Sequence, residues 1–211
     1  MQNRKLNILC LHGYRQSAKR FHEKTGSMRK GCRNFAHFDY LDAPNQIDEL
    51  IENGRAWWFS EYNQESKTYS YSSEHNHSEP YNFDCSVEKF SSSLHEKQYD
   101  GVLAFSQGAA FLAVVAAQND LLVKNGIRFV IFVAGFKSRQ HVNLLASYEN
   151  QPICIPSLHI YGETDRVIHC ERSIRLQHLF KDHECYIHKG GHYVPSLKDV
   201  LPLFLSKFLI E

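Results

Sequence analysis

The chain has 211 residues, of which 43% are hydrophobic and 22% are charged. These proportions are typical of a globular domain with a sizeable core, so we expect a single domain over residues 1–211. The formal net charge is only +1, and the basic residues are spread along the chain. This distribution argues against nucleic acid as a partner, and the lack of an apolar stretch of about 20 residues argues against stable membrane insertion.

The N-terminal segment has too short an apolar run for a secretory signal and lacks a small-residue cleavage site. We therefore expect an intracellular protein, in the cytoplasm or also in the nucleus. Six cysteines are scattered without a Cys-x-x-Cys pair, and Cys10 and Cys154 lie in apolar segments. Free, buried thiols are expected rather than disulfides or zinc ligands.

Short apolar runs alternate with segments of helical periodicity along the chain. This alternation is typical of an α/β protein with a mostly parallel sheet of about six strands and helices on both faces. Strands are expected near residues 6–11, 36–41, 102–105, 129–133, 158–161 and 184–188. Helices are expected near residues 17–30, 84–97, 107–123, 170–180 and 195–209.

Residues 53–82 interrupt the alternation with two tryptophans, four tyrosines and many serines in no clear period. A long irregular insertion in a compact domain is often a lid or a binding loop. We expect Trp57 and Trp58 to pack near the functional site and to line a substrate pocket. Residues 66–79 are expected to be exposed and mobile.

One further feature lies within this insertion, and another stretch resembles it. The pair His75 and His77 offers no third ligand of fixed geometry, so no metal site is predicted. Residues 137–151 form a second irregular stretch that is expected to border the pocket, together with Phe136 at the preceding strand end.

The pentapeptide AFSQG, residues 104–108, follows an apolar run and opens an alanine-rich helical stretch. This is the context of a nucleophile elbow, a strained turn that lifts a serine hydroxyl clear of the sheet and needs small residues two positions to either side. Gly108 and Ala104 meet that need, although Ala104 replaces the more usual glycine. The pentapeptide predicts acyl-transfer chemistry on Ser106; an ordinary serine at a strand–helix junction is the alternative.

A serine hydroxyl becomes an effective nucleophile beside a histidine base that a carboxylate orients. Asp165 and His192 each follow an expected strand, in hydrolase order, and two glycines precede His192. His188 is a competing base, but it lies inside the last strand. Glu163 and Asp182 are competing carboxylates that we expect at a turn and at a polar helix end. The order of the motifs favours Asp165 and His192.

The loop after the first strand, HGYRQS at residues 12–17, supplies the remaining component. In α/β-hydrolases a backbone N–H from this loop joins the N–H after the nucleophile to bind the developing oxyanion. We expect the N–H groups of Tyr14 and Gln107 in these roles. His12 is expected to support the turn by hydrogen bonding rather than to act as a base.

Six blocks of sequence, in chain order, resemble the FSH family of serine hydrolases. They are HGYRQS (12–17), FHEKTG (21–26), WWF (57–59), DGVLAFSQGAA (100–110), PSLH (156–159) and GGH (190–192). The resemblance covers nearly the whole chain. It implies an α/β-hydrolase fold, a triad of Ser106, Asp165 and His192, and carboxylesterase activity favouring hydrophobic, long alkyl-chain esters.

The expected reaction needs no cofactor, and its partner is a small-molecule ester. We expect activity to depend on an unprotonated His192. A thioesterase or a peptidase would use the same triad. A non-catalytic binding module on a hydrolase scaffold is the alternative from another class, with Ala104 as its only support in the sequence.

Overall fold

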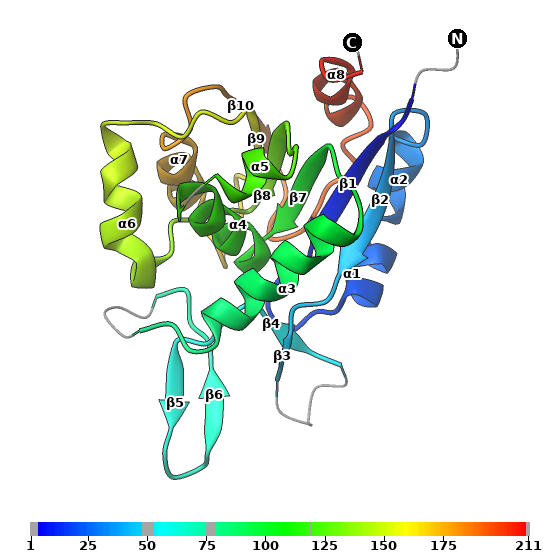
Figure 1. Ribbon diagram of the computed structural model, residues 1–211. Helices are drawn as coiled ribbons and strands as arrows, with labels where there is room; N and C mark the ends of the chain where they lie inside the picture. The colour runs from blue at the N-terminus through cyan, green and yellow to red at the C-terminus, as the bar shows by residue number, and fades with distance from the viewer. Residues whose placement is uncertain (1–3, 48–52, 75–78, 119, 210–211) are drawn as a thin grey trace.

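The computed structural model describes residues 4–47, 53–74, 79–118 and 120–209. Its centre is a six-stranded parallel sheet in the order β10-β9-β8-β7-β1-β2 (Figure 1). The strands are β1 (Leu6–Leu11), β2 (Ala36–Leu41), β7 (Gly101–Phe105), β8 (Phe129–Val133), β9 (Ser157–Gly162) and β10 (His183–His188). All six predicted strands are present, with ends within one residue of the prediction.

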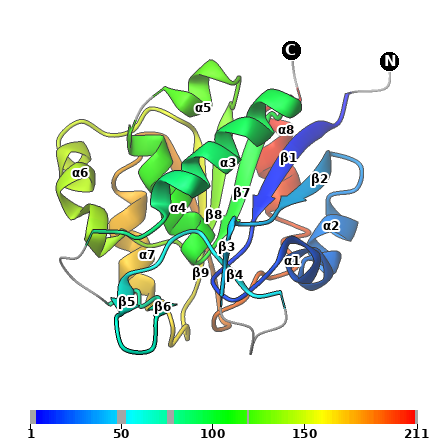
Figure 2. The same ribbon diagram turned by 60° about the horizontal axis from the view of Figure 1, so that its bottom comes forward.

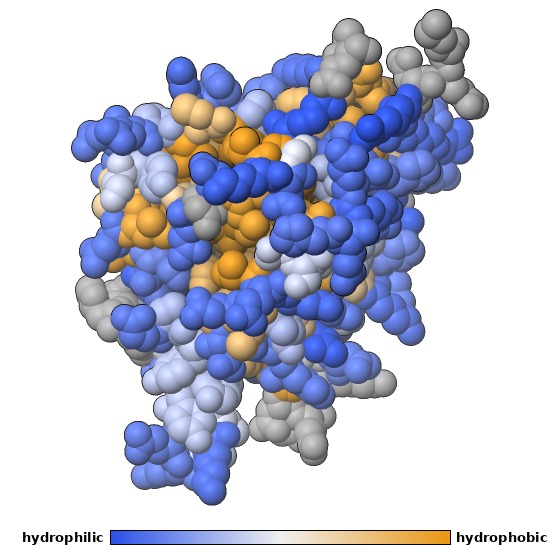
Figure 3. Space-filling view, in the orientation of Figure 1, coloured by the Kyte–Doolittle hydropathy of each residue, from blue (hydrophilic) through white to orange (hydrophobic). Residues whose placement is uncertain are grey.

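Helices cover both faces of this sheet. One face carries α3 (Phe83–Glu96), α4 (Gln107–Gln118), α5 (Leu121–Lys124), α6 (Val142–Ala146) and α7 (Cys170–Gln177). The other carries α1 (Ala18–Lys24), α2 (Gly26–Gly31) and α8 (Leu201–Ser206). Figure 3 shows a mainly hydrophilic surface on the side of α3, with hydrophobic side chains visible between the helices.

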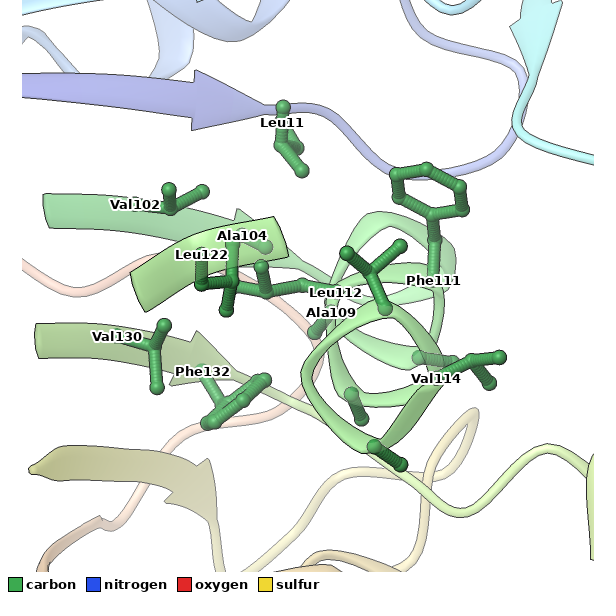
Figure 4. Packing of buried hydrophobic residues seen from close by; sticks show 14 of the residues in the cluster. Leu11, Val102, Ala104, Ala109, Phe111, Leu112, Val114, Leu122, Val130 and Phe132 are labelled. Atoms are coloured by element: carbon green, nitrogen blue, oxygen red, sulfur yellow. The ribbon is translucent and has the colours of Figure 1, made fainter. Parts of the chain in front are cut away.

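Two hydrophobic clusters fill the layers because side chains of a strand point alternately to opposite faces. Val102 and Ala104 of β7 join the cluster beneath α4, whereas Leu103 and Phe105 join the cluster beneath α1 and α8. Figure 4 shows the first cluster, in which Phe132 of β8 lies alongside α4. Each fully buried side chain of this size stabilises the fold by about 1.5–3 kcal/mol.

Three predicted helices are divided or start late, and the helix expected at 170–180 ends at Gln177. The helix expected at 17–30 is divided at Thr25, whose hydroxyl donates to the carbonyl of Phe21 and ends the first helix. The last helix starts at Leu201 because Leu197 has a left-handed φ of 53° and Pro202 suits a first helical turn. The helix expected at 107–123 is observed as α4 and α5, with residue 119 outside the described residues.

The insertion is more regular than predicted. Residues Arg55–Ala56 form β4, which pairs with β3 (Asn45–Gln46), and β5 (Glu61–Asn63) pairs with β6 (Thr68–Ser70) in a hairpin that projects from the body (Figures 1 and 2). The Asn63 side chain accepts hydrogen bonds from the N–H groups of Glu65 and Ser66, which turns the chain. His75 and His77 lie outside the described residues, and the mobility expected for 66–79 stays a prediction.

The second stretch predicted as irregular is also largely helical. It contains the short turns Arg139–His141 and Ser147–Glu149 on either side of α6. Leu145 of α6 is fully buried in the cluster beneath α4, and this burial holds the stretch against the body.

All six cysteines are free thiols, but the prediction that they are buried holds only in part. Cys10 and Cys32 are buried, whereas Cys85, Cys154 and Cys185 are exposed. Cys154 lies between Ile153 and Ile155, whose side chains point into the protein core. Because side chains alternate along an extended segment, that of Cys154 points outward. No helix among the described residues is long and apolar enough to cross a membrane.

Candidate active site

Ser106 stands at the sharp turn between β7 and α4. Its φ of 53° lies in the left-handed region, which a residue with a side chain seldom adopts. Its N–H donates to the carbonyl of Val133 at 2.9 Å, and its carbonyl accepts from the N–H of Ala110 at 3.0 Å. The strand and the helix therefore hold the turn in its strained form, and Ser106 lines an open pocket at the carboxyl end of the sheet.

The small residues around Ser106 have different structural reasons. A Cβ atom on Gly108 would lie 2.5 Å from the carbonyl oxygen of His12, so only glycine allows α4 to approach the first loop. Ala104 is fully buried in β7, where it pairs with Leu11 and Phe132 of the neighbouring strands. Its methyl group belongs to the core, and the elbow forms with alanine at this position.

His192 joins Ser106 to Asp165 in one continuous chain of hydrogen bonds. Nε2 of His192 lies 2.9 Å from Oγ of Ser106, and Nδ1 lies 2.7 Å from Oδ2 of Asp165. A carboxylate only accepts hydrogen bonds, so Nδ1 carries the proton and Nε2 faces the hydroxyl as an acceptor. The His192 ring also rests against Phe105, with the ring centres 4.8 Å apart. This is the connectivity that general-base activation of a serine requires.

The carboxylate of Asp165 is buried, and both of its oxygens accept hydrogen bonds from the protein. Its Oδ1 accepts the N–H groups of Val167 at 2.8 Å and Ile168 at 2.9 Å, while Oδ2 faces His192. Burial raises the pKa of Asp165, but the hydrogen bonds from His192, Ile168 and Val167 outweigh it, so the pKa falls below its usual value. The group is therefore ionised at neutral pH.

The loops that carry Asp165 and His192 are tied to each other. A Cβ atom on Gly162 would lie 2.1 Å from the carbonyl oxygen of Gly190, so close packing requires glycine at the end of β9. The N–H of Glu163 donates to the carbonyl of His188, and the N–H of Thr164 to that of Gly190. These backbone contacts fix the distance between the carboxylate loop and the imidazole loop.

The competing residues lie elsewhere. His188 is buried, its Nδ1 accepts the N–H of Gly190 at 3.2 Å, and burial lowers its pKa. Glu163 and Asp182 are exposed to solvent. Of the candidates considered, only Asp165 contacts His192.

The candidate oxyanion groups flank Ser106 on two elements. Gln107 is the first residue of α4, where a backbone N–H has no acceptor within the helix. Tyr14 lies in the turn that the N–H of Gln16 closes onto the carbonyl of Gly13, with Arg15 at a φ of 62°. The Gln16 side chain in turn accepts the N–H of Gly13 at 3.2 Å, which braces this loop.

His12 has the structural role expected from the sequence. It is fully buried, with Nδ1 2.8 Å from the carbonyl oxygen of Gly13 and Nε2 accepting the N–H of Ala43 at 3.1 Å. Burial lowers its pKa to about 4, so the ring is neutral. The neutral ring pins the candidate oxyanion loop to the segment that follows β2.

Trp57 and Trp58 do not line the pocket of Ser106, contrary to the prediction. Both are buried, and Nε1 of Trp57 donates to the carbonyl of His12 at 2.8 Å. The buried Gln107 amide accepts the N–H of Trp57 and donates to the carbonyl of Trp58. Trp57 and Trp58 therefore support the loop after β1 and the start of α4 from the core side. The buried side-chain amide of Gln107 needs hydrogen-bond partners, and the backbone of the two tryptophans supplies them.

The serine-side pocket, defined by Ser106 and its surroundings, has a volume of about 280 Å³. Phe136 lines it as predicted, and the other apolar groups of its lining were not predicted. They include Tyr71 from the insertion and Val167 and Ile168 from the loop after Asp165. The position of Val167 and Ile168 just after a strand end is the signal that places them there. Of the stretch 137–151, Lys137, Ser138, Arg139 and Val142 instead border a separate basic depression with Arg172 and Arg175.

Arg172 of α7 ties the insertion to this pocket. Its guanidinium donates to the carbonyl and hydroxyl oxygens of Ser73, pairs with Glu74, and lies 4.6 Å from the centre of the Phe136 ring. Arg139 pairs with the same Glu74 carboxylate at 2.6 Å. The segment 71–74 is thereby fastened over the pocket as one of its walls.

Within the described residues, no three His, Cys, Asp or Glu side chains gather as a metal site would require. The site consists of an elbow serine, a histidine and an aspartate at the carboxyl ends of parallel strands that helices cover on both faces. This combination of fold and site defines the α/β-hydrolase class of protein.

Solved structures agree with this class. Esterase PE8 has a TM-score of 0.63 at 16% identity, covering 96% of this chain and 92% of that one, and Arabidopsis thaliana SOBER1 has a TM-score of 0.61 at 13% identity, covering 98% and 100%.

Sequence comparison identifies the family. The model of the family described as "Serine hydrolase (FSH1)" matches residues 1–202, and the chain belongs to this family. Xenopus tropicalis esterase OVCA2 is 38% identical, with 99% of this chain and 95% of that protein covered. Human esterase OVCA2 is 33% identical, with 98% and 96% covered, and Caenorhabditis elegans esterase C25G4.2 is 36% identical, with 92% and 88% covered.

Proposed function

We propose that this protein is a serine carboxylesterase with Ser106 as nucleophile, His192 as general base and Asp165 as the group that orients the imidazole. The observation that carries the proposal is the hydrogen-bonded chain from Ser106 through His192 to Asp165, with links of 2.9 and 2.7 Å. His192 takes the proton of Ser106 as Oγ attacks the ester carbonyl, and it then gives that proton to the leaving alcohol. Water releases the acid by the reverse sequence.

The N–H groups of Tyr14 and Gln107 are proposed to bind the oxyanion of the tetrahedral intermediate. Their support is positional, because the two residues flank Ser106 on the first loop and at the start of α4. Preorganised backbone donors of this kind contribute about 3–4 kcal/mol each to transition-state stabilisation in other enzymes.

The substrates are proposed to be hydrophobic esters, with long alkyl chains preferred. The apolar lining of the serine-side pocket by Phe136, Val167 and Ile168 supports this class. The relatives named above carry the name esterase, which favours oxygen esters over the thioesters or peptides that the same triad would hydrolyse.

Labelling with a fluorophosphonate tests the nucleophile. Wild-type protein should be labelled stoichiometrically, and Ser106→Ala should lose both labelling and ester turnover. The matched control is Ser92→Ala, an exposed serine on α3 that should label like wild type. Labelling that survives Ser106→Ala would refute the nucleophile.

A series of p-nitrophenyl esters tests the chain-length preference. The specificity constant should rise with acyl length, because each further methylene that is buried contributes about 0.8 kcal/mol. A steady fall from the shortest acyl chain onward would refute the long-chain preference and leave the nucleophile assignment intact.

A further inference from the structure

A second pocket meets the first at His192. This histidine-side pocket has a volume of about 400 Å³ and is lined by Phe21 and Lys24 of α1 and by Tyr193 and Val194, which follow His192 in the chain. It shares the side chains of Gln16, Phe105 and His192 with the serine-side pocket. The candidate site is therefore a cleft with two arms.

The two arms differ in which reacting group they contain. Ser106 lines the serine-side pocket and not the histidine-side pocket, whereas His192 lines both. In ester cleavage the acyl carbon becomes bonded to the serine oxygen, and the leaving oxygen must lie at the histidine that protonates it. The chemistry thus places the acyl part in the arm with Ser106 and the departing part in the arm reached through His192.

We propose that the histidine-side pocket binds the alcohol part of the substrate, so that the natural substrate joins a hydrophobic acid to a hydrophobic alcohol of several carbons. This inference rests on the proposed function. Phe21, Phe105 and Val194 give the arm its apolar surface. Lys24 is exposed and is the only lysine, arginine, aspartate or glutamate of this lining, so a polar end of the alcohol meets solvent there.

The assignment separates the two half-reactions. In the first, the Ser106 oxygen bonds to the acyl carbon, the carbon–oxygen bond to the alcohol breaks, and the proton passes from Ser106 through His192 to the alcohol. Once the alcohol has left, water enters the emptied arm and completes hydrolysis to the acid. Substitutions in the histidine-side pocket should therefore change selection among alcohols without changing selection among acyl groups.

One bulky substitution in each arm tests the assignment. Val194→Phe narrows the histidine-side pocket, and Val167→Phe is the matched control in the serine-side pocket; neither side chain is buried. Specificity constants for hexyl and methyl propanoate give an alcohol ratio, and those for methyl octanoate and methyl propanoate give an acyl ratio. Acid release in a pH-stat measures all of them.

Val194→Phe should lower the alcohol ratio at least tenfold and change the acyl ratio less than twofold, and Val167→Phe should do the reverse. The size follows from a loss of roughly fourfold per methylene that can no longer be buried. With added 1-hexanol, Val194→Phe should also form less hexyl ester from the acyl-enzyme. Equal changes in both ratios, unchanged ratios, or the opposite pattern would overturn the assignment.

Fluorophosphonate labelling of wild-type protein distinguishes this failure from a failure of the proposed function. A labelled, active enzyme with the wrong ratios refutes the pocket assignment alone. A protein that is neither labelled nor active on any of the esters refutes the esterase, and the assignment with it.

Discussion

Asp165 uses its two carboxylate oxygens for different purposes. Oδ1 accepts two backbone N–H groups of its own loop, while Oδ2 accepts the Nδ1 proton of His192. An asparagine can keep the first set of bonds, because its amide oxygen can take the place of Oδ1. Its NH₂ group would then face Nδ1 of His192, which favours the tautomer whose proton lies on Nε2 and blocks proton removal from Ser106.

Asp165→Asn should therefore fold normally and lose activity. We expect kcat to fall by about 10⁴-fold, the effect of the same change in a serine-protease triad. Thermal unfolding close to that of wild type is the control for folding, and kcat on a p-nitrophenyl ester is the measurement. A decrease of less than tenfold would contradict the orienting role.

The hydroxyl of Tyr71 is buried at the wall of the serine-side pocket, and it has no hydrogen-bond partner among the described residues. Burial also raises its pKa. Tyr71→Phe should increase the free energy of unfolding by about 1 kcal/mol, because a buried polar group without a partner costs about that much or more. Tyr148→Phe is the matched control and should destabilise, since the Tyr148 hydroxyl donates to the carbonyl of Ala117. Urea denaturation of both variants measures this difference, and a destabilised Tyr71→Phe would count against it.

The convergence of Ser106, Asp165 and His192 could be predicted from sequence because each follows a strand of a parallel sheet, and strand ends converge at one edge. The roles of Trp57 and Trp58 could not. Their burial depends on Gln107, which lies about 50 positions further along the chain and hydrogen-bonds to their backbone. No local pattern contains that pairing. Tyr71 was missed for the same reason, because only the fold brings the insertion to the pocket.

At the scale of elements, the segment 71–74 forms a strap that lines the serine-side pocket and is tied to helix α7. Arg172 makes three hydrogen bonds to Ser73 and Glu74 and covers the Phe136 ring. The partly buried Arg172 is thus the main tie of the strap to α7, and the Arg139–Glu74 ion pair adds a second, more exposed one. An Arg–carboxylate contact with several further hydrogen bonds is stronger than an exposed ion pair.

Arg172→Leu should loosen the strap and weaken the pocket wall. We expect KM for a long-chain ester to rise severalfold with kcat nearly unchanged, because the strap lines the proposed acyl pocket, whereas the hydrogen-bonded chain of Ser106, His192 and Asp165 lies on other elements. Arg175→Leu, one turn further along α7 and exposed, is the matched control and should leave KM unchanged. An unchanged KM in Arg172→Leu, or a loss confined to kcat, would refute this role.

The ends of strands were easier to predict than the ends of helices. A buried strand such as β8 is a run of apolar residues with a turn at each end, so its ends can be recognised in the sequence. Helices α1 and α2 are separated at Thr25, whose hydroxyl group hydrogen-bonds to the carbonyl of Phe21. Helix α8 starts late because Leu197 has a left-handed backbone conformation. The hairpin β5–β6 depends on the Asn63 turn, which a serine-rich segment without alternation does not reveal.

For the whole molecule, buried imidazoles set how stability responds to acid. Burial lowers the pKa of His12 and of His141 to about 4 and that of His159 to about 3, from an ordinary value of 6.5. Between the lowered pKa of each folded histidine and the ordinary value of 6.5, the unfolded chain binds protons that the folded chain does not. The free energy of unfolding therefore rises with pH from about 4 to 6.5 and falls as pH decreases through this window.

His159→Phe tests this response because the ring stacks on Phe132 in the core, with 4.8 Å between ring centres, and phenylalanine keeps that contact. Each such histidine contributes a slope of about 1.4 kcal/mol per pH unit, so the variant should show a dependence shallower by this amount between pH 6 and 4.5. Ser157→Ala removes the hydroxyl 3.1 Å from Nε2 of His159 but keeps the imidazole, so it should lower stability without reducing the slope. Urea titrations across this range give both quantities.

The lowered pKa of Asp165 also makes the free energy of unfolding fall as pH decreases, but at lower pH, below the usual carboxyl range, so the two effects can be separated. An unchanged slope in His159→Phe would mean that His159 does not remain neutral in the folded protein through this range.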